Sequence, residues 1–195
     1  DDYPNLKNTH VSKATYYRLF IEDYLPKDLD FLLYLDPDVL CIDLYEDLVT
    51  DQKNKLIQSN FIVSAHSEYI KGDKKSKDTF ERLELKGNKY FNAGVMLIDF
   101  KKWISNNISE NLINHLHENK RKIVFWDQDV MNKYFDGFYQ ELSERMNFQI
   151  PIDENEYDEL FNKREKKDII FIHYAGKFKP WTVKGIFHPA GIFYQ

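Results

Sequence analysis

The chain is poor in cysteine, glycine and proline, with one, seven and six residues of each type among 195. A single cysteine, Cys41, excludes an internal disulfide and a thiolate metal site, and it is typical of a cytoplasmic protein. No apolar stretch reaches the ~20 residues that a membrane-spanning helix needs. The first residue is Asp1 and not methionine, so we expect this sequence to be a fragment of a longer protein.

Several common catalytic motifs are also missing. The sequence has no Gly-x-Gly-x-x-Gly, Walker loop, Gly-x-Ser-x-Gly or His-Glu-x-x-His, which argues against dinucleotide, ordinary ATPase, lipase-type and zincin chemistry. The formal net charge of −5 argues against a general nucleic-acid binder, because such a protein must neutralise phosphates. With 43% hydrophobic residues, the chain can bury the core of one domain, which we expect to span residues 1–195.

Two acids close the most apolar strand that the sequence predicts. Phe31 to Leu35 form an unbroken apolar run, and Asp36 and Asp38 follow on either side of Pro37. Buried carboxylates require a compensating partner, and carboxylate oxygens suit Mg²⁺ or Mn²⁺. The simpler alternative is a turn at the end of the strand, where Asp and Pro are common.

Other segments predict further elements by their apolar pattern. Runs at 61–65, 90–99 and 169–172 predict core strands, and the spacing of apolar residues over 104–116 predicts a helix. The lysine-rich segment 67–89 predicts either a long mobile loop with a function or a solvated charged face.

A helix is also predicted over residues 17–25, where it carries the candidate residue Arg18. Its expected apolar stripe consists of Tyr17, Phe20, Ile21, Tyr24 and Leu25. Arg18 borders this stripe, and by periodicity alone the simplest interpretation is a surface side chain whose stem covers apolar neighbours.

Two motifs place polar or small residues at the start of an element. Asn92 and Gly94 lie at the beginning of the strand predicted over 90–99, where small residues let a ligand approach the backbone. Asp127-Gln128-Asp129 precedes a helical pattern. Capping and the helix dipole alone can explain the two acids, but they do not explain Gln128.

The last predicted strand ends at a histidine, His173. His173 is followed by Gly176 and Lys179. Neutral histidine is a common metal ligand, glycine lets the backbone approach a phosphate, and lysine supplies a positive charge to it. Taken alone, His173 reads as an ordinary residue at a strand end, whereas with Asp36 and Asp38 it predicts a metal site of two carboxylates and one imidazole.

Five short motifs follow one another along the chain. They are Ser12-Lys-Ala-Thr-Tyr-Tyr-Arg18-Leu, Tyr34-Leu-Asp36-Pro-Asp38, Phe91-Asn92-Ala-Gly94-Val, Asp127-Gln128-Asp129 and His173-Tyr-Ala-Gly176-Lys-Phe-Lys179-Pro-Trp181. In this order they resemble glycosyltransferase family eight, the retaining sugar-nucleotide transferases that include bacterial lipooligosaccharide galactosyltransferases and glycogenin.

This resemblance implies a fold, a cofactor and a set of site residues. The implied fold is GT-A, a Rossmann-like α/β sandwich around a mainly parallel central sheet. The implied cofactor is Mn²⁺, or Mg²⁺, held by Asp36, Asp38 and His173. Positions that contact the donor sugar and the diphosphate in relatives match Arg18, Asn92, Asp127, Gln128, Gly176 and Lys179. Relatives begin with a further strand-helix-strand portion that holds uracil and ribose; this chain lacks it, and we expect that the sequence is truncated.

The resemblance also implies an activity: a hexose moves from a UDP-sugar to an acceptor hydroxyl with retention at the anomeric carbon. Asp127 and Gln128 are the catalytic candidates. The Asp127 carboxylate would stabilise an oxocarbenium-like transition state. Gln128 lies where a double displacement would need its nucleophile, and an amide oxygen is a feeble nucleophile, so we expect attack by the acceptor on the same face.

Two other functions stay open: another metal-dependent nucleotide enzyme, such as a nucleotidyltransferase, and a non-catalytic domain with a structural metal. The acceptor can be a saccharide, a lipid-linked group or a protein. We expect a cytoplasmic protein without a nucleic-acid partner, and its aromatic C-terminal tail leaves a peripheral contact at the inner membrane face open.

Overall fold

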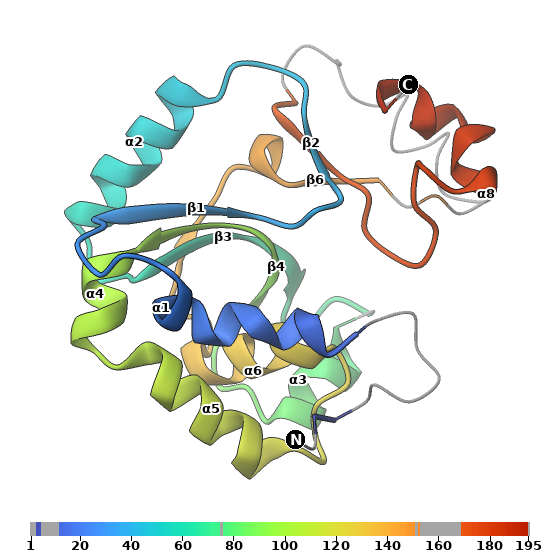
Figure 1. Ribbon diagram of the computed structural model, residues 1–195. Helices are drawn as coiled ribbons and strands as arrows, with labels where there is room; N and C mark the ends of the chain where they lie inside the picture. Colours follow the sequence, from blue (N-terminus) through green and yellow to red (C-terminus); the bar gives the residue numbers. More distant parts are fainter. Residues whose placement is uncertain (1–2, 5–11, 75, 151, 153–168, 195) are drawn as a thin grey trace.

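The computed structural model describes residues 3–4, 12–74, 76–150, 152 and 169–194. Its strands form a four-stranded sheet in the order β1-β4-β3-β5 and a three-stranded sheet in the order β2-β7-β6 (Figure 1). The strands are β1 (Phe31–Leu35), β2 (Val39–Cys41), β3 (Val63–Ile70), β4 (Lys89–Asp99), β5 (Gln140–Glu141), β6 (Phe148–Gln149) and β7 (Phe171–His173).

Helices surround these sheets. The α-helices are α1 (Ile21–Tyr24), α2 (Glu46–Ile57), α3 (Lys77–Leu83), α4 (Phe100–Ser105), α5 (Ile108–Asn119), α6 (Trp126–Phe135) and α8 (Val183–Ile186). The 3₁₀-helices are η1 (Lys13–Phe20), η2 (Glu144–Met146) and η4 (Pro189–Phe193). Within the described ranges, no helix combines the length and the apolarity that crossing a membrane requires.

Strand β4 is the centre of the larger sheet, and every residue from Tyr90 to Asp99 is buried. Both of its neighbours, β1 and β3, pair with it in the antiparallel direction. Among the described strands, the parallel pairs are β3 with β5 and β6 with β7. The mainly parallel sheet that the family resemblance implied is therefore wrong for these sheets, which are mixed. The sequence itself could not decide, because a strand covered on both faces reads as a continuous apolar run in either direction.

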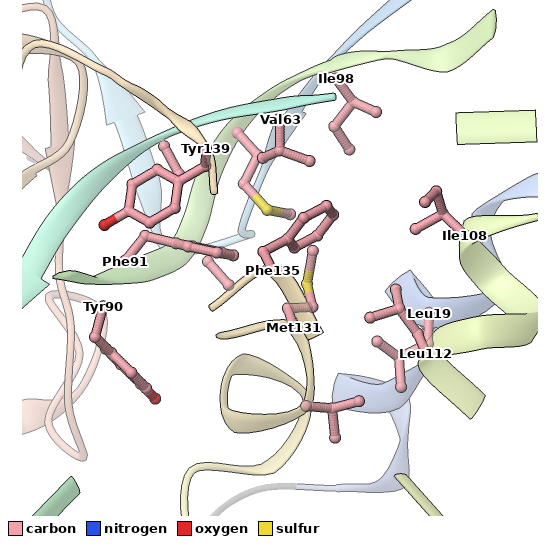
Figure 2. Close-up of a cluster of buried hydrophobic side chains, with 14 of the residues drawn as sticks. Leu19, Val63, Tyr90, Phe91, Ile98, Ile108, Leu112, Met131, Phe135 and Tyr139 are labelled. Carbon is pink, nitrogen blue, oxygen red and sulfur yellow. The ribbon is translucent and has the colours of Figure 1, made fainter. Parts of the chain in front are cut away.

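The main core lies on the side of the sheet that η1, α5 and α6 cover, whereas α2 lies on the opposite side (Figure 1). Figure 2 shows Leu19 of η1, Leu112 of α5 and Met131 of α6 converging on the core that Phe91 of β4 joins. This packing fixes η1 and the start of α6 against β4, and these elements carry most of the predicted sugar-binding residues.

The first helical segment differs from its predicted periodicity. Lys13–Phe20 is a 3₁₀-helix, in which residues three apart share a face. Tyr16 and Leu19 are buried, whereas Tyr17 and Tyr24, which the α-helical spacing placed on the apolar stripe, are 47% and 69% exposed. The predicted stripe is therefore wrong at Tyr17 and Tyr24, whereas Phe20 and Ile21 pack against the core as expected.

The segment from 67 to 89 is not one long loop. Strand β3 continues to Ile70, and α3 follows with Phe80 and Leu83 buried in the core. A few apolar residues among many lysines are enough to dock this helix, so the loop prediction is wrong over these elements. The strands predicted at 31–35 and 90–99 are confirmed.

Candidate active site

One cavity brings the candidate residues together. It has a volume of about 380 Å³ and is lined by η1, the turn after β1, strands β3, β4, β6 and β7, and the start of α6. All the predicted site residues line it: Arg18, Asp36, Asp38, Asn92, Asp127, Gln128, His173, Gly176 and Lys179.

The two acids after β1 lie beside the histidine that ends β7. Asp36 and Asp38 belong to a turn in which the Val39 N–H donates to the Asp36 carbonyl oxygen at 3.0 Å. Val39 also pairs with His173 in the antiparallel β2–β7 ladder. One ligand atom from each of Asp36, Asp38 and His173 lies within 4.8 Å of the others. The strand-end turn and the three-residue cluster, which the sequence offered as alternatives, are therefore both present. The turn holds the two acids side by side.

Asp38 lies between two basic side chains. The Lys179 ammonium forms an ion pair with its Oδ2, and His173 Nε2 lies 3.4 Å from its Oδ1. Burial favours a higher pKa for Asp38, but a protonated His173 and the Lys179 ammonium outweigh it and lower the pKa to about 2. Oδ1 is buried and has no hydrogen-bond partner among the described residues. An ionised, incompletely paired oxygen of this kind suits a cation.

Arg18 lies at the centre of the site. Its side chain is only 9% exposed, and it forms ion pairs with Asp36 Oδ1 at 2.9 Å and with Asp127 Oδ2 at 2.5 Å. Nη1 also donates to the Ala93 carbonyl oxygen at 2.5 Å. Burial lowers the pKa of Arg18, but the Asp127 and Asp36 charges raise it above its ordinary value, so the guanidinium stays charged. The surface interpretation of Arg18 is wrong.

The 3₁₀ geometry of η1 also brings Thr15 to the same acid. Residues three apart lie on one face of a 3₁₀-helix, so Thr15 and Arg18 both point towards α6. The Thr15 hydroxyl donates to Asp127 Oδ1 at 2.5 Å. Burial raises the pKa of Asp127, and the Arg18 charge and the Thr15 hydrogen bond oppose this rise. Asp127 is thus a buried carboxylate held by two groups of one helix face.

The His173 ring is held so that one nitrogen faces the acids. Its Nδ1 lies 2.9 Å from Asn147 Oδ1, and Asn147 Nδ2 donates to Asn92 Oδ1 at 3.0 Å. An amide oxygen can only accept, so in the neutral ring Nδ1 carries the hydrogen and Nε2 keeps its lone pair on the side of Asp38. This is the tautomer in which His173 can bind a metal through Nε2.

The position of Gly94 requires glycine for a reason other than the predicted approach of a ligand. A Cβ added to Gly94 would lie 2.2 Å from Cε1 of His173. The space above this glycine is therefore filled by the imidazole, and the expected close approach of a ligand to the backbone is not its main role. Gly176 differs, because its φ of +94° is a left-handed conformation that favours glycine, and no atom lies within 4 Å of the position of its Cβ.

Gln128 and Asn92 meet at a third carboxylate, that of Glu68. Gln128 Nε2 donates to Glu68 Oε2 at 3.0 Å, and Asn92 Nδ2 donates to the same oxygen at 3.2 Å. The other end of the Gln128 amide, Oε1, accepts the Ala93 N–H at 3.0 Å. Both amides are thus oriented by groups within the site.

Sequence reasoning missed Glu68 and Asn147. Glu68 falls in the segment that was predicted to be a loop, and β3 is irregular there, with register shifts on both sides of Ser67. These bulges break the alternation that would have assigned Glu68 to a face. Asn147 carries no sequence signal as a histidine partner, because its position depends on the non-local contact with β7.

Sequence comparison agrees with the resemblance described above. The model of the family Glycosyl transferase family 8 matches residues 4–185. A lipopolysaccharide 1,2-glucosyltransferase of Escherichia coli is 32% identical over 175 residues, which cover 86% of this chain and 49% of the relative. A lipopolysaccharide 1,3-galactosyltransferase of Salmonella typhimurium is 30% identical over 194 residues, which cover 98% and 56%. The chain thus spans about half the length of the curated relatives it matches.

Structural comparison gives the same assignment. The crystal structure of the galactosyltransferase LgtC in complex with donor and acceptor sugar analogs matches with a TM-score of 0.76 and 27% sequence identity. The match covers 98% of this chain and 68% of LgtC, which confirms the predicted α/β fold. Since the family model also matches most of its length, the chain belongs to glycosyltransferase family 8.

Proposed function

We propose that the protein moves a hexosyl group from a UDP-sugar to a hydroxyl group of an acceptor, with retention at the anomeric carbon. The observation that carries this proposal is the cluster of Asp36, Asp38 and His173 beside Lys179 in one cavity. The glucosyl- and galactosyltransferase names of the relatives support a hexose donor, and their lipopolysaccharide substrate supports a saccharide acceptor. A cytoplasmic location, at or near a membrane surface, belongs to the same proposal.

The three clustered side chains fit a divalent metal ion. Two carboxylates and one neutral imidazole suit Mn²⁺ or Mg²⁺, and the buried Oδ1 of Asp38 lacks a hydrogen bond. Asp36, Asp38 and His173 would hold the ion, and when bound it would supply Lewis-acid stabilisation to the departing diphosphate. His173 must be neutral for this role, because a protonated imidazole has no lone pair to give to a metal.

The side of the cavity near β7 would bind the diphosphate. Lys179 brings an ammonium group to within ion-pair distance of Asp38, and Gly176 leaves its backbone open. Both groups would stabilise the negative charge that develops on the leaving UDP, and both are in place before the reaction begins.

The side of the cavity near α6 would bind the sugar. Arg18 and Asn92 would position the hexose, and the Asp127 carboxylate would stabilise positive charge at the anomeric carbon. Gln128 Oε1 already accepts the Ala93 N–H, which makes it still less suited to attack carbon. The acceptor oxygen would therefore form its bond on the face from which the phosphate oxygen departs, and its proton would pass to that oxygen.

The test is release of UDP from UDP-glucose and UDP-galactose by the full-length protein, with Mn²⁺ and with EDTA, in water and with added saccharides. We expect metal-dependent release from one of the two donors. Asp38→Ala should abolish it, whereas Asp47→Ala, which removes an exposed acid on α2, should not. If neither donor reacts and UDP does not bind, the proposal is wrong, and pyrophosphate release from nucleoside triphosphates would then identify a nucleotidyltransferase.

A further inference from the structure

The side-chain amide of Gln128 is held in one orientation by groups that do not all belong to the cavity. Its Oε1 accepts from Ala93, and its Nε2 donates to Glu68 at 3.0 Å and contacts the Tyr90 hydroxyl at 3.3 Å. Tyr90 is fully buried and does not line the cavity. In Figure 2 its ring points away from those of Phe91 and Tyr139.

The Tyr90 hydroxyl has a defined direction. It lies 2.8 Å from Asp129 Oδ1, and a carboxylate can only accept, so the tyrosine hydrogen points to Asp129. Burial and the charge of Asp129 raise the pKa of Tyr90, which keeps the hydroxyl protonated. The lone pairs of the hydroxyl are left for Gln128 Nε2. Tyr90 therefore selects the amide NH₂ group and rejects the amide oxygen at this position.

Asp129 is in turn fixed from several sides. It is fully buried, and its Oδ2 accepts from the backbone N–H groups of Val124 and Phe125 at 2.7 and 2.8 Å. Arg82 Nη1 of α3 donates to the same oxygen at 2.7 Å. These bonds hold the chain at the entry to α6, where Trp126 has a left-handed φ of +47° that a bulky residue rarely adopts.

We infer that Tyr90, with Asp129 and Arg82 behind it, is a positioning residue for catalysis. The chain Arg82–Asp129–Tyr90 holds the Gln128 amide with its NH₂ group towards Glu68 and its oxygen towards the backbone of Ala93. Both amide hydrogens are then engaged, one by Glu68 and one by Tyr90, so the Gln128 side chain is held in one orientation at the cavity wall. This inference rests on the proposed sugar transfer, because it assigns the chain a role in that reaction.

The decisive variant is Tyr90→Phe, which removes one hydroxyl and keeps the ring. The matched control is Tyr16→Phe, because Tyr16 is also fully buried and its hydroxyl donates to the Pro4 carbonyl, a group outside the cavity. Glu68→Gln is a second variant, on a partly exposed residue whose change weakens the other bond to the Gln128 amide.

The first readout does not need turnover. The side-chain NH₂ group of Gln128 gives a ¹⁵N-¹H signal that Gln128→Glu identifies by its loss. We expect Tyr90→Phe and Glu68→Gln each to speed hydrogen exchange of this group by about tenfold, as expected for one lost hydrogen bond, and Tyr16→Phe to leave it unchanged. Unchanged exchange in Tyr90→Phe, with faster exchange in Glu68→Gln as the positive control, would overturn the inference.

The second readout is the rate of UDP release with Mn²⁺. We expect Tyr90→Phe to lower kcat by about tenfold with the KM for the donor within about twofold, whereas Tyr16→Phe keeps both. Equal losses of kcat in the two variants would indicate a general effect of buried hydroxyls and would overturn the inference. If the parent protein releases no UDP, the proposed function fails, and the exchange experiment alone decides whether Tyr90 holds the amide.

Discussion

Two aspartates lie on either side of Gln128, and each forms an ion pair with an arginine, yet their surroundings differ. Asp127 faces the cavity and pairs with Arg18 of η1. Asp129 faces the core and pairs with Arg82 of α3. Positions two apart on a helix of 3.6 residues per turn are separated by about 200°. One short motif can therefore supply a group to the active site and an anchor to the core.

The difference between the two acids is how completely their oxygens are paired. Asp129 accepts from two backbone N–H groups, from Arg82 and from Tyr90. Asp127 Oδ2 has its ion pair but no hydrogen bond among the described residues. A fully paired buried carboxylate stabilises the fold, and a partly paired one keeps capacity for a ligand. We call Asp129, whose oxygens are fully paired, the closed acid, and Asp127, which is partly paired, the open acid. The two should respond differently to the same substitution.

The largest effect should come from Asp127→Asn. We expect turnover of the UDP-sugar to fall by about 10²- to 10³-fold, because the charge that would stabilise the transition state is lost. The free energy of unfolding should change by less than about 1 kcal/mol, since Arg18 keeps Asp36 as a partner. Steady-state kinetics and urea unfolding test the two halves separately. A variant that keeps its activity would remove Asp127 from the catalytic candidates.

The reverse pattern is expected for Asp129→Asn. This change leaves the mostly buried Arg82 guanidinium with only the exposed Asp78 carboxylate at 3.9 Å, and we expect it to cost about 3 kcal/mol of unfolding free energy. Urea unfolding of both asparagine variants under one condition measures the contrast directly. Equal destabilisation by the two substitutions would show that the distinction between the open and the closed acid is false.

Gly94→Ala extends the contrast to His173, whose Nδ1 is paired with Asn147 while Nε2 faces the acids. The added methyl group would overlap the imidazole and push it from its place, at a cost of about 1–3 kcal/mol in stability. We expect Mn²⁺ affinity to fall by about tenfold, measured by calorimetry. Gly72→Ala, at an open turn with φ of +108°, is the control for backbone strain and should leave Mn²⁺ binding unchanged.

The smallest effect is expected at Glu141, a half-exposed acid outside the cavity. Its burial favours a higher pKa, but His66, Ser67 and Lys89 outweigh it and lower the pKa to about 2. Burial favours a lower pKa for His66, and Glu141 outweighs it to raise that pKa above 6.5. Glu141→Gln should therefore cost only about 0.5 kcal/mol, because exposed ion pairs are screened.

The pH dependence of that cost has a definite sign. The contribution of Glu141 is present above its ordinary pKa of 4.5 and is lost as the pH falls towards 2. The contribution of His66 is present below 6.5 and is lost as the pH rises through its higher folded value. The melting temperatures of parent and Glu141→Gln should differ most between pH 4.5 and 6.5. A difference that keeps growing above this window would contradict the ion pair.

The positions of the candidate residues followed from sequence more readily than the sheet did. Strands β1 and β7 belong to different sheets, but each is an apolar run that ends in polar groups. Asp36 and Asp38 follow β1, and His173 ends β7. That pattern is local, so each residue could be chosen without knowing the topology. The direction of β4 could not be chosen this way, because its apolar run is compatible with parallel and antiparallel neighbours.

Helical period and bulges explain the remaining errors. The interpretation of Arg18 as a surface side chain assumed an α-helix, and a 3₁₀-helix turns the same residue inwards with Thr15. Glu68 was missed because two irregular steps in β3 place it in the cavity, and such steps leave no sequence pattern. The catalytic, metal-binding and substrate-binding roles assigned to these residues stay predictions until the variants above are measured.

The β2–β7 ladder determines when the metal ligands can come together. Asp36 and Asp38 leave the ribosome well before His173, which lies far along the sequence from them. The register that pairs Val39 with His173 closes a very long loop, and such non-local contacts form slowly. A chain that stalls before this step has two acids without their imidazole. If Mn²⁺ binding requires all three ligands, the ion would bind only chains that have completed folding. Binding would then stabilise the folded protein by mass action.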